Sequence, residues 1–324
     1  MSTFWDDMVR PFMVLAPMAD VTDPAFRRVI AQYGKPDVLW TEFVSADGLY
    51  HTREVNKLPD DENPLLKDLV YGENEHPIIV QLFSAKPEMM EYAAALMVDL
   101  GFDGVDINMG CPDRSVEKQG AGASLMKQPE LAVELIEAAK SGVQGKIPVS
   151  VKTRIGYNKN ELDMWLPKLL SAEPAAVTVH TRTRKELSLV PARWEHIEEA
   201  VRIRDAAGSK TYIIGNGDVE TPEQGRVLAK EYGADGVMIG RGIFGNPWLF
   251  SEQVPGLDEK LRVLQEHCDA FSELCGHKSF AVMKKHFKAY VTGFDGAKEM
   301  RIELMGCNTA EEVAEVITKW RNKV

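Results

Sequence analysis

The chain has 324 residues, 44% of them hydrophobic, and a formal net charge of −11 at pH 7. This length and apolar content fit a globular protein with one large domain, or with a barrel and an appendage. No apolar run approaches the ~18 residues of a membrane-spanning helix, and the first residues lack the basic start and apolar stretch of a secretory signal, so we expect a cytoplasmic protein without a membrane partner.

Short apolar runs typical of β-strands alternate with helical patterns along most of the chain. We predict eight strands, at residues 13–17, 38–41, 78–82, 104–107, 149–152, 176–180, 212–215 and 236–239. Helical patterns lie between them, several with proline at the first position, at residues 24–33, 87–100, 129–140, 162–171, 194–207 and 222–232. Eight β/α units within about 240 residues predict an α/β protein with a TIM (β/α)8 barrel, and a doubly wound sheet is the alternative.

Beyond residue 250 the pattern becomes helical. Residues 251–258 are rich in turn formers, and later apolar residues recur at helical spacing. We therefore predict a barrel domain at residues 1–250 and an all-helical domain at residues 251–324. Residues 256–324 contain as many basic as acidic side chains, so the negative charge belongs to the barrel. One stretch there predicts a local positive face, with an ordinary solvated helix as the alternative: Lys278, Lys284, Lys285, His286 and Lys288.

The four cysteines, Cys111, Cys268, Cys275 and Cys307, include no CxxC pair. Without that spacing or a secretory signal, neither a disulfide framework nor a zinc site is expected, and we predict no bound metal. Cys111 differs from the others because it follows a predicted buried strand. A thiol at the mouth of a barrel, rather than in its core, is a candidate for chemistry.

Polar or conformationally special residues follow almost every predicted strand. In a TIM barrel these C-terminal strand ends converge on one mouth, where ligands bind. The sequence therefore predicts that one pocket is surrounded by Pro17, Met18, Ala19, Gln81, Asn108, Cys111, Lys152, Arg154, His180, Asn216, Gly217, Asp218, Gly240 and Arg241.

The residue types around this pocket favour a phosphorylated, electron-rich ligand. Glycine-rich turns at residues 215–217 and 240–242 follow the last two strands, where barrel enzymes commonly bind phosphate, although ordinary tight turns are the alternative. Lys152 suits the N1–O2 edge of a reduced flavin, and the Gln81 amide suits the ring's donors and acceptors. Alternatively, the lysine amine reaches only water. Arg154 and Arg182 add positive charge at the mouth of this pocket, so we expect anions to enter it.

Several motifs resemble the tRNA-dihydrouridine synthases: Ala16-Pro-Met-Ala-Asp-Val-Thr-Asp23, Asn108-Met-Gly-Cys-Pro112, Gly120-Ala-Gly-Ala-Ser-Leu125, Val151-Lys-Thr-Arg154, His180-Thr-Arg-Thr183, Gly215-Asn-Gly-Asp218 and Ile239-Gly-Arg-Gly242 with the residues up to Trp248. The resemblance is strong over residues 11–250 and weaker in the helical tail. Thr181 departs from the family's usual glycine in its histidine motif, and the loop that follows also differs.

This resemblance implies a flavoenzyme in which NADPH, or NADH, reduces bound FMN, and the flavin passes hydride to C6 of a tRNA uridine. Separately, we expect the protein to be a monomer. Cys111 then matches the general acid that protonates C5, and Asn108 a residue that holds the base. Arg154 and Arg182 are predicted substrate contacts. The remaining pocket residues match FMN-binding positions, namely Pro17, Met18, Ala19, Gln81, Lys152, His180, Asn216, Gly217, Asp218, Gly240 and Arg241. An ordinary thiol is protonated at neutral pH, which suits a proton donor.

Two alternatives remain open from the sequence. The first is a flavin oxidoreductase that acts on a free pyrimidine, as in dihydroorotate or dihydropyrimidine oxidation. The second is an RNA-binding barrel without redox activity. The helical tail disfavours the first alternative, because a small substrate needs no such platform, and the residues at the predicted mouth disfavour the second.

Overall fold

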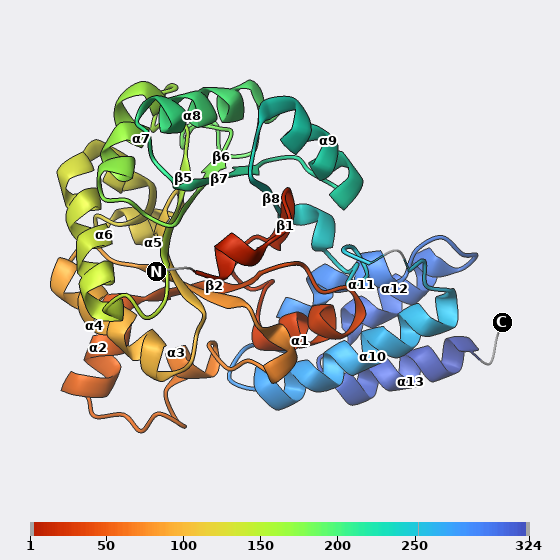
Figure 1. Ribbon diagram of the computed structural model, residues 1–324. Coiled ribbons are helices and arrows are strands. Elements are labelled where there is room, and N and C mark those ends of the chain that lie inside the picture. Colours follow the sequence, from red (N-terminus) through yellow and green to blue (C-terminus); the bar gives the residue numbers. More distant parts are fainter. Residues whose placement is uncertain (1–2, 252, 322–324) are drawn as a thin grey trace.

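The computed structural model describes residues 3–251 and 253–321. Residues 1–2 and 322–324, at the ends of the two predicted domains, and residue 252 lie outside the described residues. Figure 1 shows a barrel, drawn from red to blue-green, beside a group of blue C-terminal helices.

Eight strands form one sheet with the order β1-β8-β7-β6-β5-β4-β3-β2, and all neighbouring strands are parallel. A parallel bridge between Val14 and Val38, with the Leu15 N–H donating to the Val38 carbonyl (3.1 Å), joins β1 to the start of β2. The sheet therefore closes on itself, which confirms the TIM barrel over the doubly wound alternative. The strands are β1 (Phe12–Leu15), β2 (Leu39–Ser45), β3 (Ile78–Phe83), β4 (Gly104–Met109), β5 (Val149–Arg154), β6 (Ala176–His180), β7 (Tyr212–Asn216) and β8 (Gly236–Ile239).

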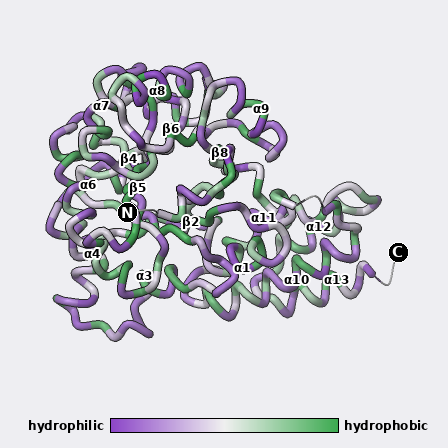
Figure 2. The backbone as a smooth tube through the Cα atoms, viewed as in Figure 1, coloured by the Kyte–Doolittle hydropathy of each residue, from purple (hydrophilic) through white to green (hydrophobic). Residues whose placement is uncertain are grey.

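The main outer helices fall where the sequence predicted them. Proline occupies the first turn in several, and α1 and α9 have side-chain N-caps: the Asp23 carboxylate accepts from the Phe26 N–H (2.9 Å) and the Thr221 hydroxyl from the Gln224 N–H (3.2 Å). Hydrophilic and hydrophobic residues are mixed along these helices (Figure 2), and their buried apolar residues belong to the core of the barrel. They are α1 (Pro24–Tyr33), α4 (Pro87–Asp99), α6 (Pro129–Val143), α7 (Leu162–Ser171), α8 (Glu195–Ala206) and α9 (Pro222–Tyr232).

The connection between β2 and β3 contains helices that the sequence did not predict. They are α2 (Ala46–Tyr50), the π-helical η2 (His51–Val55) and α3 (Pro64–Lys67). Elements of four or five residues are too short to show a 3.6-residue apolar period. The beginnings of α2 and α3 are nevertheless capped, because the Ser45 hydroxyl accepts from the Gly48 N–H (3.0 Å) and the Asn63 side chain from the Leu65 N–H (3.1 Å).

The C-terminal helices pack on the barrel through α1. They are α10 (Leu257–Leu274), η6 (Phe280–Met283), α11 (Lys284–Tyr290), α12 (Ala297–Gly306) and α13 (Ala310–Arg321). Their apolar core includes Ala25, Val29 and Trp248 from the barrel side, and α1 lies along α10 (Figure 1). The helical tail is thus held by a shared hydrophobic core, which fixes its direction relative to the barrel mouth.

The positive face predicted in the tail is divided between the interface and the surface. Lys278 is mostly buried and forms ion pairs with Glu42 (2.5 Å) and Asp68 (2.9 Å), and His286 is fully buried. Burial lowers the pKa of His286 to about 3, so this ring is neutral. The stretch predicted to carry the face therefore supplies part of the core as well as surface charge.

Within the described residues, no helix is both long and apolar enough to cross a membrane. The same part of the chain holds no group of three or more histidine, cysteine, aspartate or glutamate side chains arranged to hold a metal ion.

Candidate functional site

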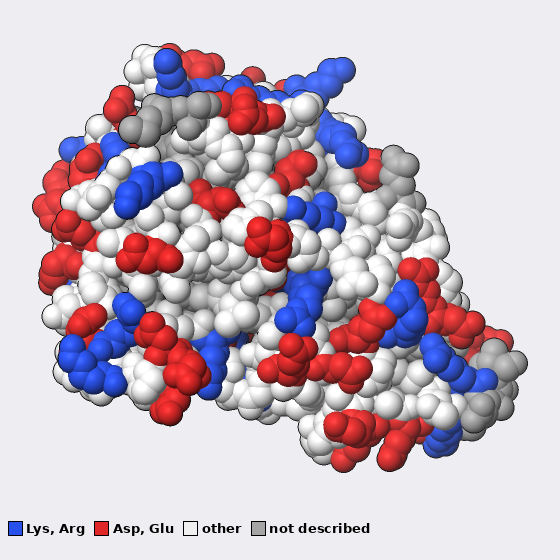
Figure 3. Space-filling view, turned by 60° about the horizontal axis from the view of Figure 1, so that its bottom comes forward, with Lys and Arg blue, Asp and Glu red and all other residues white. Residues whose placement is uncertain are grey.

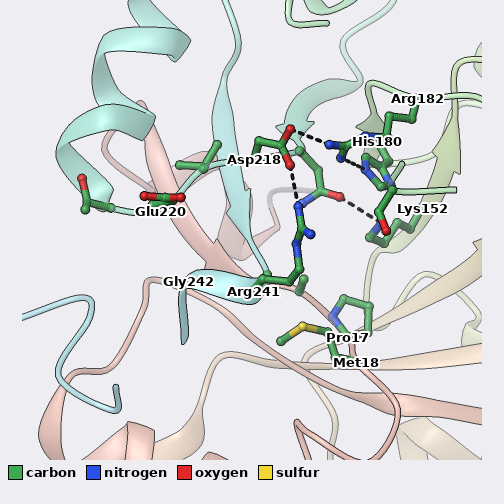
Figure 4. A pocket seen from close by; sticks show the side chains of 16 residues that line it. Pro17, Met18, Lys152, His180, Arg182, Asp218, Glu220, Arg241 and Gly242 are labelled. Atoms are coloured by element: carbon green, nitrogen blue, oxygen red, sulfur yellow. Dashed lines mark hydrogen bonds and ion pairs between the residues drawn. The ribbon is translucent and has the colours of Figure 1, made fainter. Parts of the chain in front are cut away.

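A cavity of about 790 Å³ opens at the C-terminal ends of the strands (Figure 4). Its wall includes predicted residues from β1, β5, β6, β7 and β8 and the turns that follow them: Pro17, Met18, Lys152, His180, Arg182, Asn216, Gly217, Asp218, Gly240 and Arg241. Further lining residues come from the same loops, among them Ser188, Glu220 and Gly242. The structure thus brings together residues separated by more than half of the sequence.

The other predicted residues lie outside the cavity wall. Ala19 is exposed in the turn after β1, whereas Gln81 and Asn108 are buried at the strand ends beside the cavity. Asn108 pairs in register with Lys152 on the neighbouring strand, so the β4 end and the cavity wall are adjacent. Cys111 lies in the loop that follows β4, and Arg154 is the last residue of β5.

Among the described residues, Lys152 is one of three cations in the cavity wall, with Arg182 and Arg241. Its ammonium group donates one hydrogen bond, to Asn216 Oδ1 (3.3 Å), and has capacity for three. Burial first, and then the nearby Arg154 charge, lower the pKa of Lys152 to about 8. An anionic or electron-rich partner in the cavity would favour the protonated form. This lysine therefore fits the edge of a flavin ring.

Two arginines and one aspartate form a charged network in the same wall (Figure 4). Asp218 forms ion pairs with Arg182 (2.5 Å) and with Arg241 (2.6 Å). Arg182 is nearly buried, whereas the Arg241 side chain is 63% exposed and lines the cavity. His180 stays neutral, because burial and then the Arg154 charge hold its pKa well below the usual value. The network supplies positive charge suited to a phosphate group.

The glycine turn after β7 is shaped by close packing. Gly217 has φ +133°, and a Cβ there would lie 2.7 Å from the Ala192 Cβ. Its carbonyl accepts from Trp194 Nε1 (2.8 Å), and the neighbouring Asn216 Nδ2 donates to the Met238 carbonyl (2.7 Å). Only glycine fits this backbone, and the turn that results lies in the cavity wall. The donors and charges present therefore fit a phosphorylated flavin.

Arg154 and Arg182 are held by the protein itself. Arg154 Nε donates to the Gly110 carbonyl (2.8 Å), and its Nη1 donates to the carbonyls of Thr183 (3.1 Å) and Leu187 (2.9 Å). Arg182 Nε similarly donates to the Val190 carbonyl (2.6 Å). Both guanidinium groups brace the loop after β6, and only Arg182 also lines the cavity. Direct contact of either with a substrate stays a prediction.

Cys111 lies half-buried in the loop after β4. Its N–H donates to Asn108 Oδ1 (2.9 Å), and its carbonyl accepts from the Ala123 N–H (2.9 Å). Burial raises the pKa of the thiol, and the charges of Arg154 and Lys152 are close enough to lower it in part. The net effect is a thiol that remains protonated at neutral pH. This state suits a proton donor rather than a nucleophile.

Asp106 lies near the site and was not among the residues predicted from the sequence. It lies on β4, is fully buried, and accepts from Gln81 Nε2 (2.6 Å) and the Ser150 hydroxyl (2.9 Å). An acidic residue inside the otherwise apolar run of β4 was the available signal, because buried charge requires partners. Burial raises the pKa of its carboxyl to about 6.

Replacing Gly122 with alanine is expected to displace Cys111. Gly122 has φ +62°, and its new Cβ would lie 2.8 Å from both the Cys111 carbonyl oxygen and Val116 Cγ1. Gly208→Ala is a matched control, because Gly208 also has φ +62° but no atom within 4 Å of the new Cβ. Urea unfolding should show a loss of about 1 kcal/mol for the control and a clearly larger loss for Gly122→Ala. Equal losses would contradict this role of Gly122.

Comparisons with known proteins agree with this geometry. The family model described as dihydrouridine synthase (Dus) matches residues 14–323. A probable tRNA-dihydrouridine synthase 2 of Bacillus subtilis strain 168 is 39% identical over 325 residues, which cover 99% of this chain and 97% of the relative. A probable tRNA-dihydrouridine synthase of Staphylococcus aureus strain Mu50 is 38% identical over 322 residues, covering 98% and 95%.

Solved structures share the fold at low sequence identity. A histamine dehydrogenase from Rhizobium sp. 4-9 superposes with a TM-score of 0.53 at 14% identity, over 82% of this chain and 48% of that chain. A 2-naphthoyl-CoA reductase superposes with a TM-score of 0.57 at 12% identity, over 75% of this chain and 50% of that chain. These likenesses support the barrel alone. From the family match, the two relatives and the cavity at the barrel mouth, we conclude that the chain belongs to the dihydrouridine synthase family.

Proposed function

We propose that this enzyme reduces uridines in tRNA to 5,6-dihydrouridine, with FMN as the bound cofactor and NADPH, or NADH, as the electron donor. The observation that carries the proposal is the position of a protonated thiol, Cys111, beside a cationic cavity at the mouth of the barrel. Both named relatives bear the same activity in their names. We further propose that the enzyme acts in the cytoplasm as a monomer.

The cavity residues divide into a phosphate end and a ring end. We assign the phosphate to the backbone of Gly217 and Gly240 and to Arg241, and the ring edge to Lys152. Pro17 and Met18 form the wall on the side away from Asp218 (Figure 4). A bound flavin would supply the hydride that the C6 atom of uracil receives.

The protein's own contribution to the reaction is to hold the base and donate a proton. Asn108 Nδ2 donates to Gln81 Oε1 (2.9 Å), and the second hydrogen of this amide remains for a uracil carbonyl. The Gln81 amide nitrogen donates to Asp106, and its oxygen accepts from Asn108. We therefore propose that Gln81 contributes mainly by orienting these two neighbours. Cys111 gives its proton to C5 on the face of the base opposite the flavin, which completes the saturation of the C5–C6 bond.

The barrel of residues 1–250 would then carry the chemistry, and the helical domain of residues 251–324 would bind tRNA. A second cavity, of about 390 Å³, lies between α11 and α12. It is lined by basic and apolar side chains, namely Lys284, Phe287, Lys288, Lys298, Arg301, Ile302 and Met305. Figure 3 shows acidic and basic groups interleaved on one face of the molecule, without a broad basic field there. We propose that tRNA binding depends on the few cations of this cavity.

Removal of two of these cations is expected to weaken tRNA binding. In Lys284→Ala/Lys288→Ala the KM for tRNA should rise about tenfold, and the slope of log affinity against log salt should fall by about one unit per lost phosphate contact. The kcat at saturating tRNA should not change. Lys319→Ala, an exposed lysine on α13 paired with Glu303 (2.7 Å), is the matched control and should behave as wild type. An unchanged KM in the double variant would assign tRNA binding elsewhere.

The function is tested with purified protein, FMN, NADPH and tRNA from cells that lack this enzyme. We expect a yellow protein that forms dihydrouridine in tRNA and turns over free uracil or orotate far more slowly. Equal turnover of a free pyrimidine would favour the small-molecule oxidoreductase. A protein without flavin absorbance, and without stabilisation by added FMN, would favour the non-redox RNA-binding barrel.

A further inference from the structure

A continuous row of hydrogen bonds runs from the barrel interior to Cys111. Asp106 accepts from Gln81 Nε2 (2.6 Å), and Gln81 Oε1 accepts from Asn108 Nδ2 (2.9 Å). Asn108 Oδ1 then accepts from the N–H groups of Gly110 (3.2 Å) and Cys111 (2.9 Å). All three side chains are buried, with at most 6% of each residue exposed, so water offers them no easy substitute partner.

The direction of this row is set at its buried end. A carboxylate has only acceptor oxygens, so Gln81 must turn its amide nitrogen toward Asp106. The Gln81 oxygen consequently faces Asn108, and the Asn108 oxygen faces the N–H of Cys111. If the first amide reversed, the second would reverse as well. The Asn108 amide nitrogen would then face the Cys111 N–H, donor against donor, and the loop would have to move.

We propose that Asp106 is a positioning residue, whose carboxylate orients the amides of Gln81 and Asn108 and thereby fixes the backbone that carries Cys111. The effect on catalysis rests on the proposed function, in which Cys111 is the proton donor. The effect on the position of Cys111 does not, because thiol reactivity is measurable without any RNA.

Arg154 holds the same loop from the other side. Its Nε donates to the Gly110 carbonyl (2.8 Å), while the N–H of Gly110 donates to Asn108. The row that begins at Asp106 thus anchors the peptide groups on both sides of Gly110, and Arg154 anchors the second of them as well. With its backbone held in this way, Cys111 has little freedom except in its side chain, and small displacements of a reacting group carry large costs in rate.

The test uses Asp106→Asn, which keeps the size of the side chain but allows either an oxygen or a nitrogen to face Gln81. Ser150→Ala is the matched control, because it removes the other hydrogen bond to Asp106 (2.9 Å) and leaves the row intact. Asp106→Ala serves as a second variant without any acceptor. Folding of each protein is checked by circular dichroism and by its content of bound flavin.

Two measurements are made on each variant. The first is the rate of alkylation of Cys111 by iodoacetamide as a function of pH, located by mass spectrometry, with Cys111→Ala as the blank. The other cysteines, Cys268, Cys275 and Cys307, are buried in the folded protein. The second is the kcat and KM for dihydrouridine formation in tRNA.

For Asp106→Asn we expect a shifted pH profile of alkylation, a kcat reduced by about tenfold or more, and an unchanged KM for tRNA, since the helical tail is untouched. Ser150→Ala should match wild type in both measurements. The proposal is overturned if folded Asp106→Asn and Asp106→Ala alkylate and turn over like wild type, or if Ser150→Ala causes the same loss. If wild type itself forms no dihydrouridine, the proposed function fails, and the alkylation profiles still decide the role of Asp106.

Discussion

Cys111→Ala is expected to reduce dihydrouridine formation in tRNA by about 10²–10⁴-fold, the usual contribution of a positioned general acid. The thiol is half-buried, and burial raises its pKa, so the wild-type side chain carries its proton at neutral pH. Alanine removes that proton source and leaves the rest of the loop in place. Bound flavin and the oxidation of NADPH without tRNA should be unaffected, because Cys111 does not line the main cavity.

The measurement is dihydrouridine per tRNA in single-turnover reactions started with reduced enzyme. Cys111→Ser gives a useful comparison, because a hydroxyl of much higher pKa should donate the proton far less readily than the thiol. Both variants should bind tRNA with wild-type affinity. Full tRNA reduction by Cys111→Ala would remove Cys111 from the mechanism.

Lys152→Met is expected to weaken FMN binding strongly. The FMN affinity of this variant should also no longer fall as the pH rises above 8. The pKa of Lys152 is lowered to about 8, mainly by burial, so the amine of the free enzyme begins to lose its proton at that pH. An anionic ligand raises this pKa again by favouring the ammonium form. In wild type, affinity should therefore be constant well below pH 8 and fall by at most about tenfold per pH unit above it, with uptake of a proton on binding.

This prediction is checked by fluorescence titration of apoenzyme with FMN between pH 7 and pH 9.5, in wild type, Lys152→Met and a surface control. Lys86→Met is a suitable control, because Lys86 is largely exposed, pairs with Asp47 (2.7 Å) and does not line the cavity. Cys111→Ala should be included, since its thiol also titrates at alkaline pH. The same loss of affinity above pH 8 in Lys152→Met would show that another group causes it.

The barrel was predictable because its strands are short apolar runs at regular spacing, and most pocket residues were predictable because they follow those runs. Lys152, His180 and Arg241 needed only the rule that C-terminal strand ends meet at one mouth. The short helices between β2 and β3 were not predictable in this way, because four or five residues show no helical period.

The sequence did not reveal which polar side chains are free to contact a ligand and which are bonded to other groups of the protein. Arg154 stands beside the predicted pocket but has its guanidinium on the carbonyls of Gly110, Thr183 and Leu187. Lys278 was part of a predicted positive face but pairs with Glu42 and Asp68 at the interface with the barrel. Such contacts join residues far apart in the chain, so local patterns carry no information about them.

Reduction of uridine in tRNA by this enzyme is tested by mapping dihydrouridine in RNA from cells that lack the gene and from cells that regain it. We predict that one or more tRNA positions lose dihydrouridine in its absence, regain it with the wild-type chain, and do not regain it with Cys111→Ala. Unchanged tRNA, or restoration by Cys111→Ala, would contradict the account. Loss confined to ribosomal RNA would contradict the assignment of tRNA as substrate.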